Sequence, residues 1–241
     1  MQLTLRMQNA YALTLALSVL DRVHPGAATE LAQHLLMAAD FGDSYGEWPT
    51  PTETTRMLSN IVMMGMGEPL YNYDNVVKAM QICMDPEGLA ISRKRITLST
   101  SGVVPMIEQC GKDLGIRLAI SLHAPRDDLR SDIMPINKKY PIEQLMEACR
   151  DYPHTSPSNR ITFEYVMLRN VNDSATDAKD LIKILSGIHA KVNLIPFNPW
   201  PGADFECSDA DVIEQFAAII ERAGIPAPIR KTRGQDILAA C

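Results

Sequence analysis

A terminal cysteine and four short clusters of small or polar residues are the parts of this 241-residue sequence that could do chemistry. Cys241 follows a basic, glycine-containing turn and a short apolar stretch, residues 229–241. A thiol activated by its surroundings can act as a nucleophile or carry a one-carbon group. A terminal cysteine is more often inert than reactive. Cys241 is therefore a candidate for a reactive thiol only when it is considered together with the four clusters.

Two of the clusters contain glycine and follow the first two predicted strands. Residues 65–69 (GMGEP) include Gly67, which lets the backbone approach a ligand closely, and Glu68, whose carboxylate could pair with an ammonium group. Residues 98–102 (LSTSG) include Ser99 and two further hydroxyl groups, which suit a ribose or a carboxylate. Alone, each cluster also fits a tight turn or a helix cap.

The other two clusters follow later strands. The third predicted strand ends in Ser121, Leu122 and His123. The imidazole of His123 could serve as an acid, a base or a hydrogen-bond donor, or be a structural group. Asn198 lies between prolines in residues 193–199 (NLIPFNP), where it could bind an adenine or an amino-acid group, or form a turn.

The elements that must position these residues alternate from residue 60 onward. We expect strands at 60–64, 95–99, 117–122, 160–168, 191–196 and 226–230, with helices at 75–84, 104–110, 142–150, 174–185 and 208–223. Such alternation predicts an α/β fold of βαβ units with parallel strands, and about six units favour a partial barrel. Because ligands bind at the carboxyl ends of such strands, we expect the four clusters to converge on one cleft.

Composition and charge narrow the function classes. A net charge of −6 argues against a strongly cationic nucleic-acid surface, although the basic clusters at 93–95 and 230–233 are candidates for local contacts or for a solvated rim. No apolar run approaches the roughly 20 residues of a membrane helix, so we expect no membrane partner. The five cysteines are dispersed and odd in number, which favours a reducing cytoplasm over a disulfide framework.

The sequence resembles the RlmN family of dual-specificity RNA methyltransferases over roughly residues 45–241. The resemblance rests on the four clusters with their flanks, on residues 134–140 (MPINKKY) and on residues 230–241. It implies a partial (β/α)6-type radical SAM barrel and methylation of C2 of an adenine in 23S rRNA and tRNA. It also implies S-adenosylmethionine and a 4Fe–4S cluster as cofactors, RNA as partner, and a monomer.

The resemblance further implies roles for individual residues. Gly67 and Glu68 match the turn that holds the methionine part of S-adenosylmethionine. Five further residues match other contacts to that cofactor: Ser99, Ser121, Leu122, His123 and Asn198. Cys241 matches the cysteine that is methylated and then carries the carbon to the base. C2 of adenine is electron-poor, so a radical route driven by the cofactor replaces an ordinary polar displacement.

The sequence departs from the family at its beginning. Residues 1–44 form a helix-permissive segment without a family match, and residues 45–241 are the predicted radical SAM domain. The family's Cys-x3-Cys-x2-Cys loop, which holds the cluster, has no match, since no cysteine precedes Cys83. The family's first strand and N-terminal RNA-binding domain also have no match. We therefore expect either a methyltransferase whose first strand and cluster loop are missing here, or a catalytically inactive truncated remnant that only binds S-adenosylmethionine or RNA.

Overall fold

The computed structural model describes residues 60–65, 67–86, 90–200 and 202–231. These residues fall into two compact units. The first unit holds the described residues up to Thr100 together with Gln109–Arg117, and the second holds Ser101–Glu108 and the described residues from Leu118 onward. Residues 1–44 lie outside the described residues, so their separation from the domain at 45–241 stays a prediction.

The first unit is built around two parallel strands joined by a helix. Its elements are β1 (Ile61–Met63), η2 (Pro69–Asn72), α3 (Tyr73–Met84), η3 (Arg93–Arg95) and β2 (Ile96–Thr100). Ile61 pairs with Ile96 and Met63 with Leu98, and the parallel direction requires the crossover that α3 provides. The buried face of α3 repeats at helical spacing, with Val76, Met80 and Cys83 all inside.

The second unit contains three parallel strands, each followed by helix. Helix α4 (Val104–Asp113) begins in this unit, and the remaining elements are β3 (Arg117–Ser121), α5 (Asp127–Ile133), η4 (Pro135–Lys138), α6 (Ile142–Arg150), β4 (Ile161–Met167), α7 (Ala175–Ile184), β5 (Ala190–Pro196) and α8 (Ala210–Arg222). The strands pair in chain order, β3 with β4 and β4 with β5. Ser121, Glu164 and Asn193 share one cross-strand row, because Ser121 is opposite Glu164 and Glu164 opposite Asn193.

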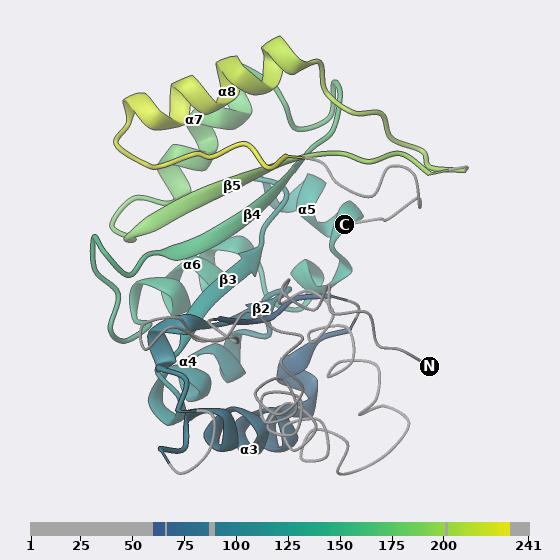
Figure 1. The fold of residues 1–241 in the computed structure, drawn as a ribbon. Helices are drawn as coiled ribbons and strands as arrows, with labels where there is room; N and C mark the ends of the chain where they lie inside the picture. Colours follow the sequence, from purple (N-terminus) through teal and green to yellow (C-terminus); the bar gives the residue numbers. More distant parts are fainter. Residues whose placement is uncertain (1–59, 66, 87–89, 201, 232–241) are drawn as a thin grey trace, which may run out of the picture. The chain divides into compact units, whose positions relative to one another are not determined.

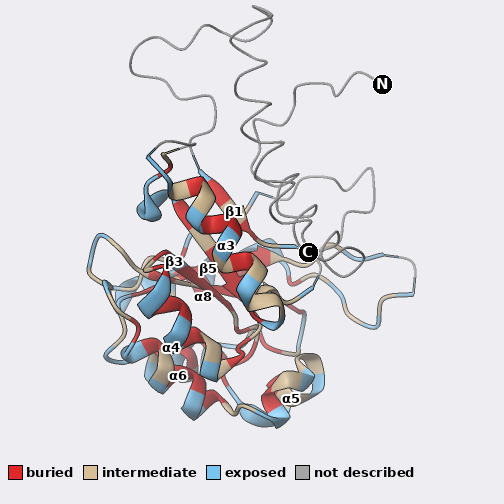
Figure 2. Cartoon of the chain, turned by 90° about the horizontal axis from the view of Figure 1, so that it is seen from below, coloured by how far each residue is buried: buried red, intermediate tan, exposed pale blue. Residues whose placement is uncertain are grey.

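The core of the second unit lies between these strands and their helices. Along β4 every second residue, Phe163, Tyr165 and Met167, is fully buried. The ring of Tyr165 packs on that of Phe216 in α8 at 5.3 Å between centroids, so this face of β4 points toward the helices. α7 and α8 lie side by side next to β5 (Figure 1). Helix α6 buries one side and leaves the other exposed (Figure 2).

These elements confirm the predicted α/β fold with parallel strands, with two differences. Residues 127–133 form helix α5, which the apolar pattern did not predict. The predicted last strand at 226–230 is reduced to a single parallel bridge between Leu194 and Ile229. Its backbone still follows β5, since the amides of Val192 and Leu194 donate to the carbonyls of Pro226 and Pro228. The two prolines cannot donate in return, which prevents a regular ladder.

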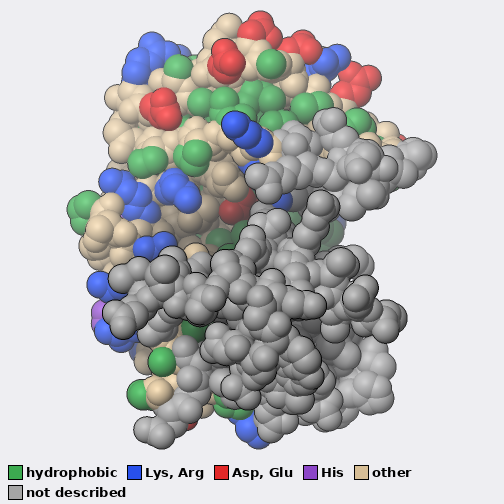
Figure 3. All heavy atoms as spheres, viewed as in Figure 1, with side chains coloured by type: hydrophobic (Ala, Val, Ile, Leu, Met, Phe, Trp, Pro, Cys, Tyr) green, Lys and Arg blue, Asp and Glu red, His purple; other side chains and the backbone are tan. Residues whose placement is uncertain are grey.

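The surface of the described part carries both signs of charge. In the view of Figure 3, Asp and Glu side chains gather toward the region of α8, whereas Lys and Arg side chains lie mainly elsewhere on the described face. Among the described residues, no helix combines the length and the apolar character needed to cross a membrane.

Candidate functional site

In the first unit, the predicted site residues lie where two paired strands end. Gly67 has φ 97°, a left-handed conformation that favours glycine, and it lies in the turn between β1 and η2. Glu68 is the N-cap of η2, and its carboxylate accepts a hydrogen bond from the Leu70 amide at 3.0 Å. Ser99, in β2, is largely buried, with 8% of its surface exposed.

In the second unit, the segment Ser121–His123 ends β3. Ser121 is the last residue of the strand, and Leu122 is fully buried. The amides of Leu122 and His123 both donate to the carbonyl of Glu164, at 3.1 and 3.2 Å. His123 has φ 60°, which is uncommon for a residue with a side chain. The backbone thus turns sharply at the point where β3 ends.

The imidazole of His123 is held in one protonation state. Its Nδ1 accepts a hydrogen bond from the Val166 amide at 3.2 Å, so a neutral ring carries its proton on Nε2. Desolvation of the partly buried side chain lowers the pKa of His123 to about 4, with a further contribution from the positive charge of Arg130. At neutral pH, His123 is therefore an uncharged hydrogen-bond donor through Nε2.

A buried acid beside Ser121 was missed by the sequence reasoning. Glu164 is only 5% exposed, and it accepts a hydrogen bond from Asn193 Nδ2 at 2.6 Å on the neighbouring strand. Burial raises the pKa of Glu164, while the bond from Asn193 and the charges of Arg230 and Lys191 act in the opposite direction. The available signal was a lone charged residue in the middle of an apolar strand, which is unusual unless the residue is partnered.

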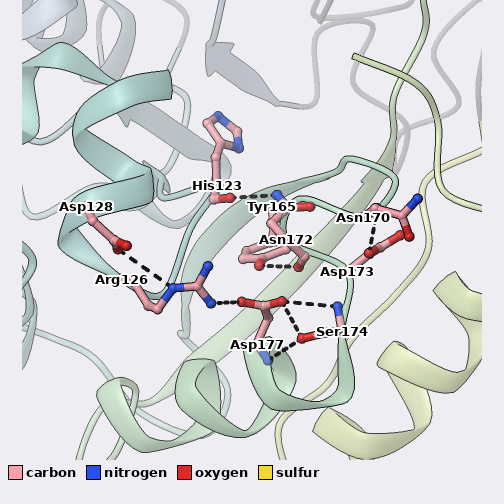
Figure 4. Close-up of polar contacts among 9 residues, drawn as sticks. All are labelled: His123, Arg126, Asp128, Tyr165, Asn170, Asn172, Asp173, Ser174 and Asp177. Atoms are coloured by element: carbon pink, nitrogen blue, oxygen red, sulfur yellow. Dashed lines mark hydrogen bonds and ion pairs between the residues drawn. The ribbon is translucent and has the colours of Figure 1, made fainter.

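A second polar network connects the end of β3 with the start of α7 (Figure 4). Arg126 forms an ion pair with Asp177, whose side chain is only 5% exposed, and a longer contact with Asp128 at 3.7 Å. Asp177 also completes the capping box of α7, because it accepts hydrogen bonds from the backbone and hydroxyl of Ser174. Ser174 is therefore the N-cap of α7.

Asn198 lies two residues beyond β5, among aromatic side chains. The ring of Phe197 packs edge-on against Trp200 at 5.3 Å and against Phe205 at 6.4 Å between centroids. Trp200 remains 42% exposed. β4 separates the end of β5 from the end of β3, so Asn198 and His123 follow two strands of the same unit that are not adjacent.

The donor set can be compared with the two implied cofactors. Hydroxyl, imidazole and amide groups at strand ends are of the types that bind the sugar, base and amino-acid groups of S-adenosylmethionine, so these residues fit it. The described cysteines do not fit a 4Fe–4S cluster. Cys83, Cys110 and Cys149 are buried on three helices, and burial raises the pKa of Cys83 to about 11 and of Cys149 to about 12. Within the described ranges, no three His, Cys, Asp or Glu side chains form a metal-binding group.

Two observations remain, one on Cys241 and one on a pocket that the predicted site residues do not line. Cys241 lies outside the described residues. An open pocket of about 270 Å³ lies between α4 and α6, and its lining consists of Val104, Pro105, Glu108, Gln144, Glu147, Ala148 and Asp151. None of the predicted site residues lines this pocket, and its three carboxylates would repel a phosphate backbone.

Comparison with known proteins finds a family and close relatives. Residues 53–182 match the Radical SAM superfamily. The chain is 65% identical over 199 residues to the dual-specificity RNA methyltransferase RlmN of Rhodospirillum rubrum, which covers 83% of this chain and 46% of that protein. It is 64% identical over 200 residues to the protein of the same name from Gluconobacter oxydans, covering 83% of this chain and 49% of that one.

Solved structures agree with these relatives. A radical SAM methyltransferase from Sphaerobacter thermophilus superposes with a TM-score of 0.76 at 42% identity, covering 89% of this chain and 60% of that one. The resemblance to the RlmN family that the sequence motifs indicated is thus confirmed. The chain spans about half the length of the curated relatives it matches.

Proposed function

The chain belongs to the Radical SAM superfamily, and we propose on that basis that it is the S-adenosylmethionine-binding part of a methyltransferase acting on adenine in RNA. Support for the RNA substrate comes from the names of its relatives, which are 65% and 64% identical to it. The proposed reaction is methylation of C2 of an adenine in 23S rRNA and tRNA. The proposed location is the cytoplasm, with the protein as a monomer.

The observation that carries this proposal is the end of β3. There the chain presents a serine hydroxyl, a neutral imidazole that donates through Nε2, and a backbone fixed by β4. We propose that Ser121, Leu122 and His123 contact S-adenosylmethionine in the second unit, together with Asn198. In the first unit, the proposed contacts are Gly67, Glu68 and Ser99.

S-adenosylmethionine would supply a methyl group on a positively charged sulfur. The contribution of the chain is to bind and orient the molecule: Glu68 offers a carboxylate to an ammonium group, and His123 offers a proton donor that stays uncharged at neutral pH. We propose Cys241 as the residue that carries the methyl carbon. No step is assigned to a cluster, because the described cysteines do not fit one.

Calorimetric titration of the 241-residue chain with S-adenosylmethionine tests the proposal. We expect one binding site per chain and an affinity about ten-fold lower in His123→Ala, a change equivalent to about 1.4 kcal/mol. His189→Ala is the matched control, because His189 is exposed and precedes β5 at its amino end. Absence of binding to the unaltered chain, or an equal loss in both variants, would contradict the proposal.

A second candidate function is binding without catalysis, and the misfit between the described cysteines and a cluster favours it. Mass spectrometry of Cys241 after incubation of the chain with S-adenosylmethionine, and after co-expression with RNA, separates the two. A methyl group on Cys241 supports the methyltransferase. An unmodified Cys241 in a chain that binds S-adenosylmethionine supports the binding-only function.

A further inference from the structure

The three carbonyl groups at the end of β3 are each bound by a buried polar side chain. Arg130 donates to the carbonyls of Ser121 and Leu122, both at 3.1 Å. Asn172 donates to the carbonyl of His123 at 2.8 Å (Figure 4). These bonds add to the two that the amides of Leu122 and His123 make with β4. The backbone of this segment is therefore fixed on both sides.

Arg130 is an unusual residue to find at this place. It is fully buried in α5, and besides the two carbonyls of the segment it binds the Ser101 carbonyl at 2.7 Å and Asn137 Oδ1 at 2.8 Å. Its partners are thus oxygen atoms of backbone and amide groups. Burial lowers the pKa of Arg130 to about 10, so the guanidinium remains charged at neutral pH. A buried charge is costly unless its donors are hydrogen-bonded, and here two of the four bonds of Arg130 go to the segment that ends β3.

Asn137 links Arg130 to the chain around it. Its Oδ1 receives the guanidinium, and its Nδ2 donates to the carbonyl and carboxylate of Asp127 and to the Ser131 hydroxyl, at 2.8 to 3.2 Å. Asn137 lies in the MPINKKY stretch (residues 134–140), for which no ligand contact is predicted. Its bonds to Arg130 and Asp127 give this stretch a structural role.

Asn172 performs a similar task from the loop between β4 and α7. It is fully buried, its Nδ2 binds the carbonyls of His123 and Val166, and its Oδ1 accepts from the Leu168 amide at 2.8 Å. Its own carbonyl accepts the Tyr165 hydroxyl at 2.7 Å. Because a left-handed backbone is unfavourable for histidine, the φ of 60° at His123 needs such external support.

We propose that Arg130 and Asn172 are positioning residues that hold Ser121, Leu122 and His123 in the geometry needed to bind S-adenosylmethionine. This inference rests on the proposed function. Two side chains from separate elements are committed to the same three residues, although an ordinary strand-to-helix connection needs neither. At metal sites, outer residues that orient the ligating groups typically change affinity or activity about 10- to 100-fold when they are removed, and we expect an effect at the lower end of this range here.

The test combines an affinity with a spectroscopic signal from His123. Nitrogen-15 NMR of the 241-residue chain reports which ring nitrogen carries the proton, and calorimetry reports the affinity for S-adenosylmethionine. In the unaltered chain we expect the proton on Nε2. In Asn172→Ala we expect a mixture of both tautomers and an affinity about ten-fold lower. Arg130→Lys, which keeps the charge but not the planar fork, should lower the affinity to a similar extent.

Leu181→Ala is the control, because Leu181 is fully buried in α7 and has no bond to the segment. It should lower the melting temperature and leave the tautomer and the affinity unchanged. If Asn172→Ala does not fold, Asn172→Asp replaces it, since the carboxylate keeps the shape but cannot donate to the carbonyl of His123.

The outcomes separate this inference from the proposed function. An unaltered chain that does not bind S-adenosylmethionine removes the proposed function and this inference with it. An unaltered chain that binds, together with Asn172 and Arg130 variants that keep both affinity and tautomer, overturns the positioning role alone. A loss in Leu181→Ala as large as in Asn172→Ala also overturns it.

Discussion

Individual side chains near the end of β3 depend on their surroundings for their protonation state. His123 is kept neutral by desolvation and by the charge of Arg130, and Glu164 is a buried acid opposite Ser121 on the neighbouring strand. Each departure of a pKa from its ordinary value is also a statement about stability as a function of pH.

For His123, stability should fall on acidification. Its pKa is about 4 in the folded chain and 6.5 ordinarily, so between these values the unfolded chain binds a proton that the folded chain does not. The contribution is complete above about pH 6.5 and is lost as the pH falls toward 4. Urea unfolding of the unaltered chain and of His123→Asn between pH 4 and 7 measures it. Asn tolerates a left-handed backbone, so this variant isolates the ring.

We expect the unaltered chain to lose more stability than His123→Asn over this range. His189→Asn, which changes an exposed ring, should behave like the unaltered chain. Parallel pH profiles for the unaltered chain and His123→Asn would contradict the prediction.

For Glu164, stability should change with pH in the opposite direction to that for His123. A raised pKa of an acid means that the folded chain keeps its proton longer, so stability is lost as the pH rises above the ordinary value of 4.5. Glu164→Gln keeps an oxygen that can accept from Asn193 and cannot ionise. It should therefore be more stable than the unaltered chain at pH 8, by a margin that grows with pH. Glu143→Gln, at an exposed position of α6, should show no such margin in the same denaturation series.

At the scale of elements, the connection from β2 to α4 depends on one glycine. Gly102 has φ 113°, and a Cβ there would lie 3.3 Å from Leu145 and 3.4 Å from Nη2 of Arg130. The turn thus makes room for the guanidinium that holds the end of β3.

Gly102→Ala should therefore destabilise the fold by about 1–3 kcal/mol, through backbone strain and crowding of Arg130. Gly224→Ala is the matched control, because Gly224 also has a positive φ, of 80°, but no atom within 4 Å of the added Cβ. Chemical denaturation of both variants separates crowding from strain. The prediction fails if the two substitutions are equally destabilising.

The strands and helices differ in how well the sequence predicted them. Strands β1 to β5 and the long helices follow apolar patterns at their own periods, and all of them were predicted within a few residues. Helix α5 was missed because its buried residue is Arg130, a charged side chain that a hydrophobic pattern places in solvent. Tertiary partners, which the pattern does not contain, keep this arginine inside.

The sequence predicted part of the candidate site and missed the rest. Ser121, His123 and Asn198 stand in clusters with recognisable types and spacing. Asn172 had no such signal, and Glu164 had only that of a charged residue within an apolar strand, because their roles come from bonds to residues 49 and 29 positions away in the chain. Only the packed structure shows which backbone groups they reach.

At the scale of the whole molecule, each of the two units carries its own share of the predicted cofactor contacts, and the cysteines form no common cluster site within the described residues. Cluster ligands are thiolates, whereas burial keeps Cys83 and Cys149 protonated.

Anaerobic reconstitution with iron and sulfide should therefore leave the 241-residue chain well below the roughly four irons per chain of a complete cluster. Iron and sulfide analysis of the purified chain measures this. The RlmN protein of Rhodospirillum rubrum, treated in parallel, is the control. A stoichiometric cluster on the 241-residue chain would contradict the prediction.

The burial of three thiols on helices also makes the protein convenient for chemical labelling. Alkylating reagents attack thiolates, so Cys83, Cys110 and Cys149 should react slowly in the native state. Once the partly exposed Cys207 is replaced by alanine, fast incorporation of a maleimide dye would report on Cys241 alone. A fluorophore attached in this way would follow that residue as S-adenosylmethionine or RNA is added.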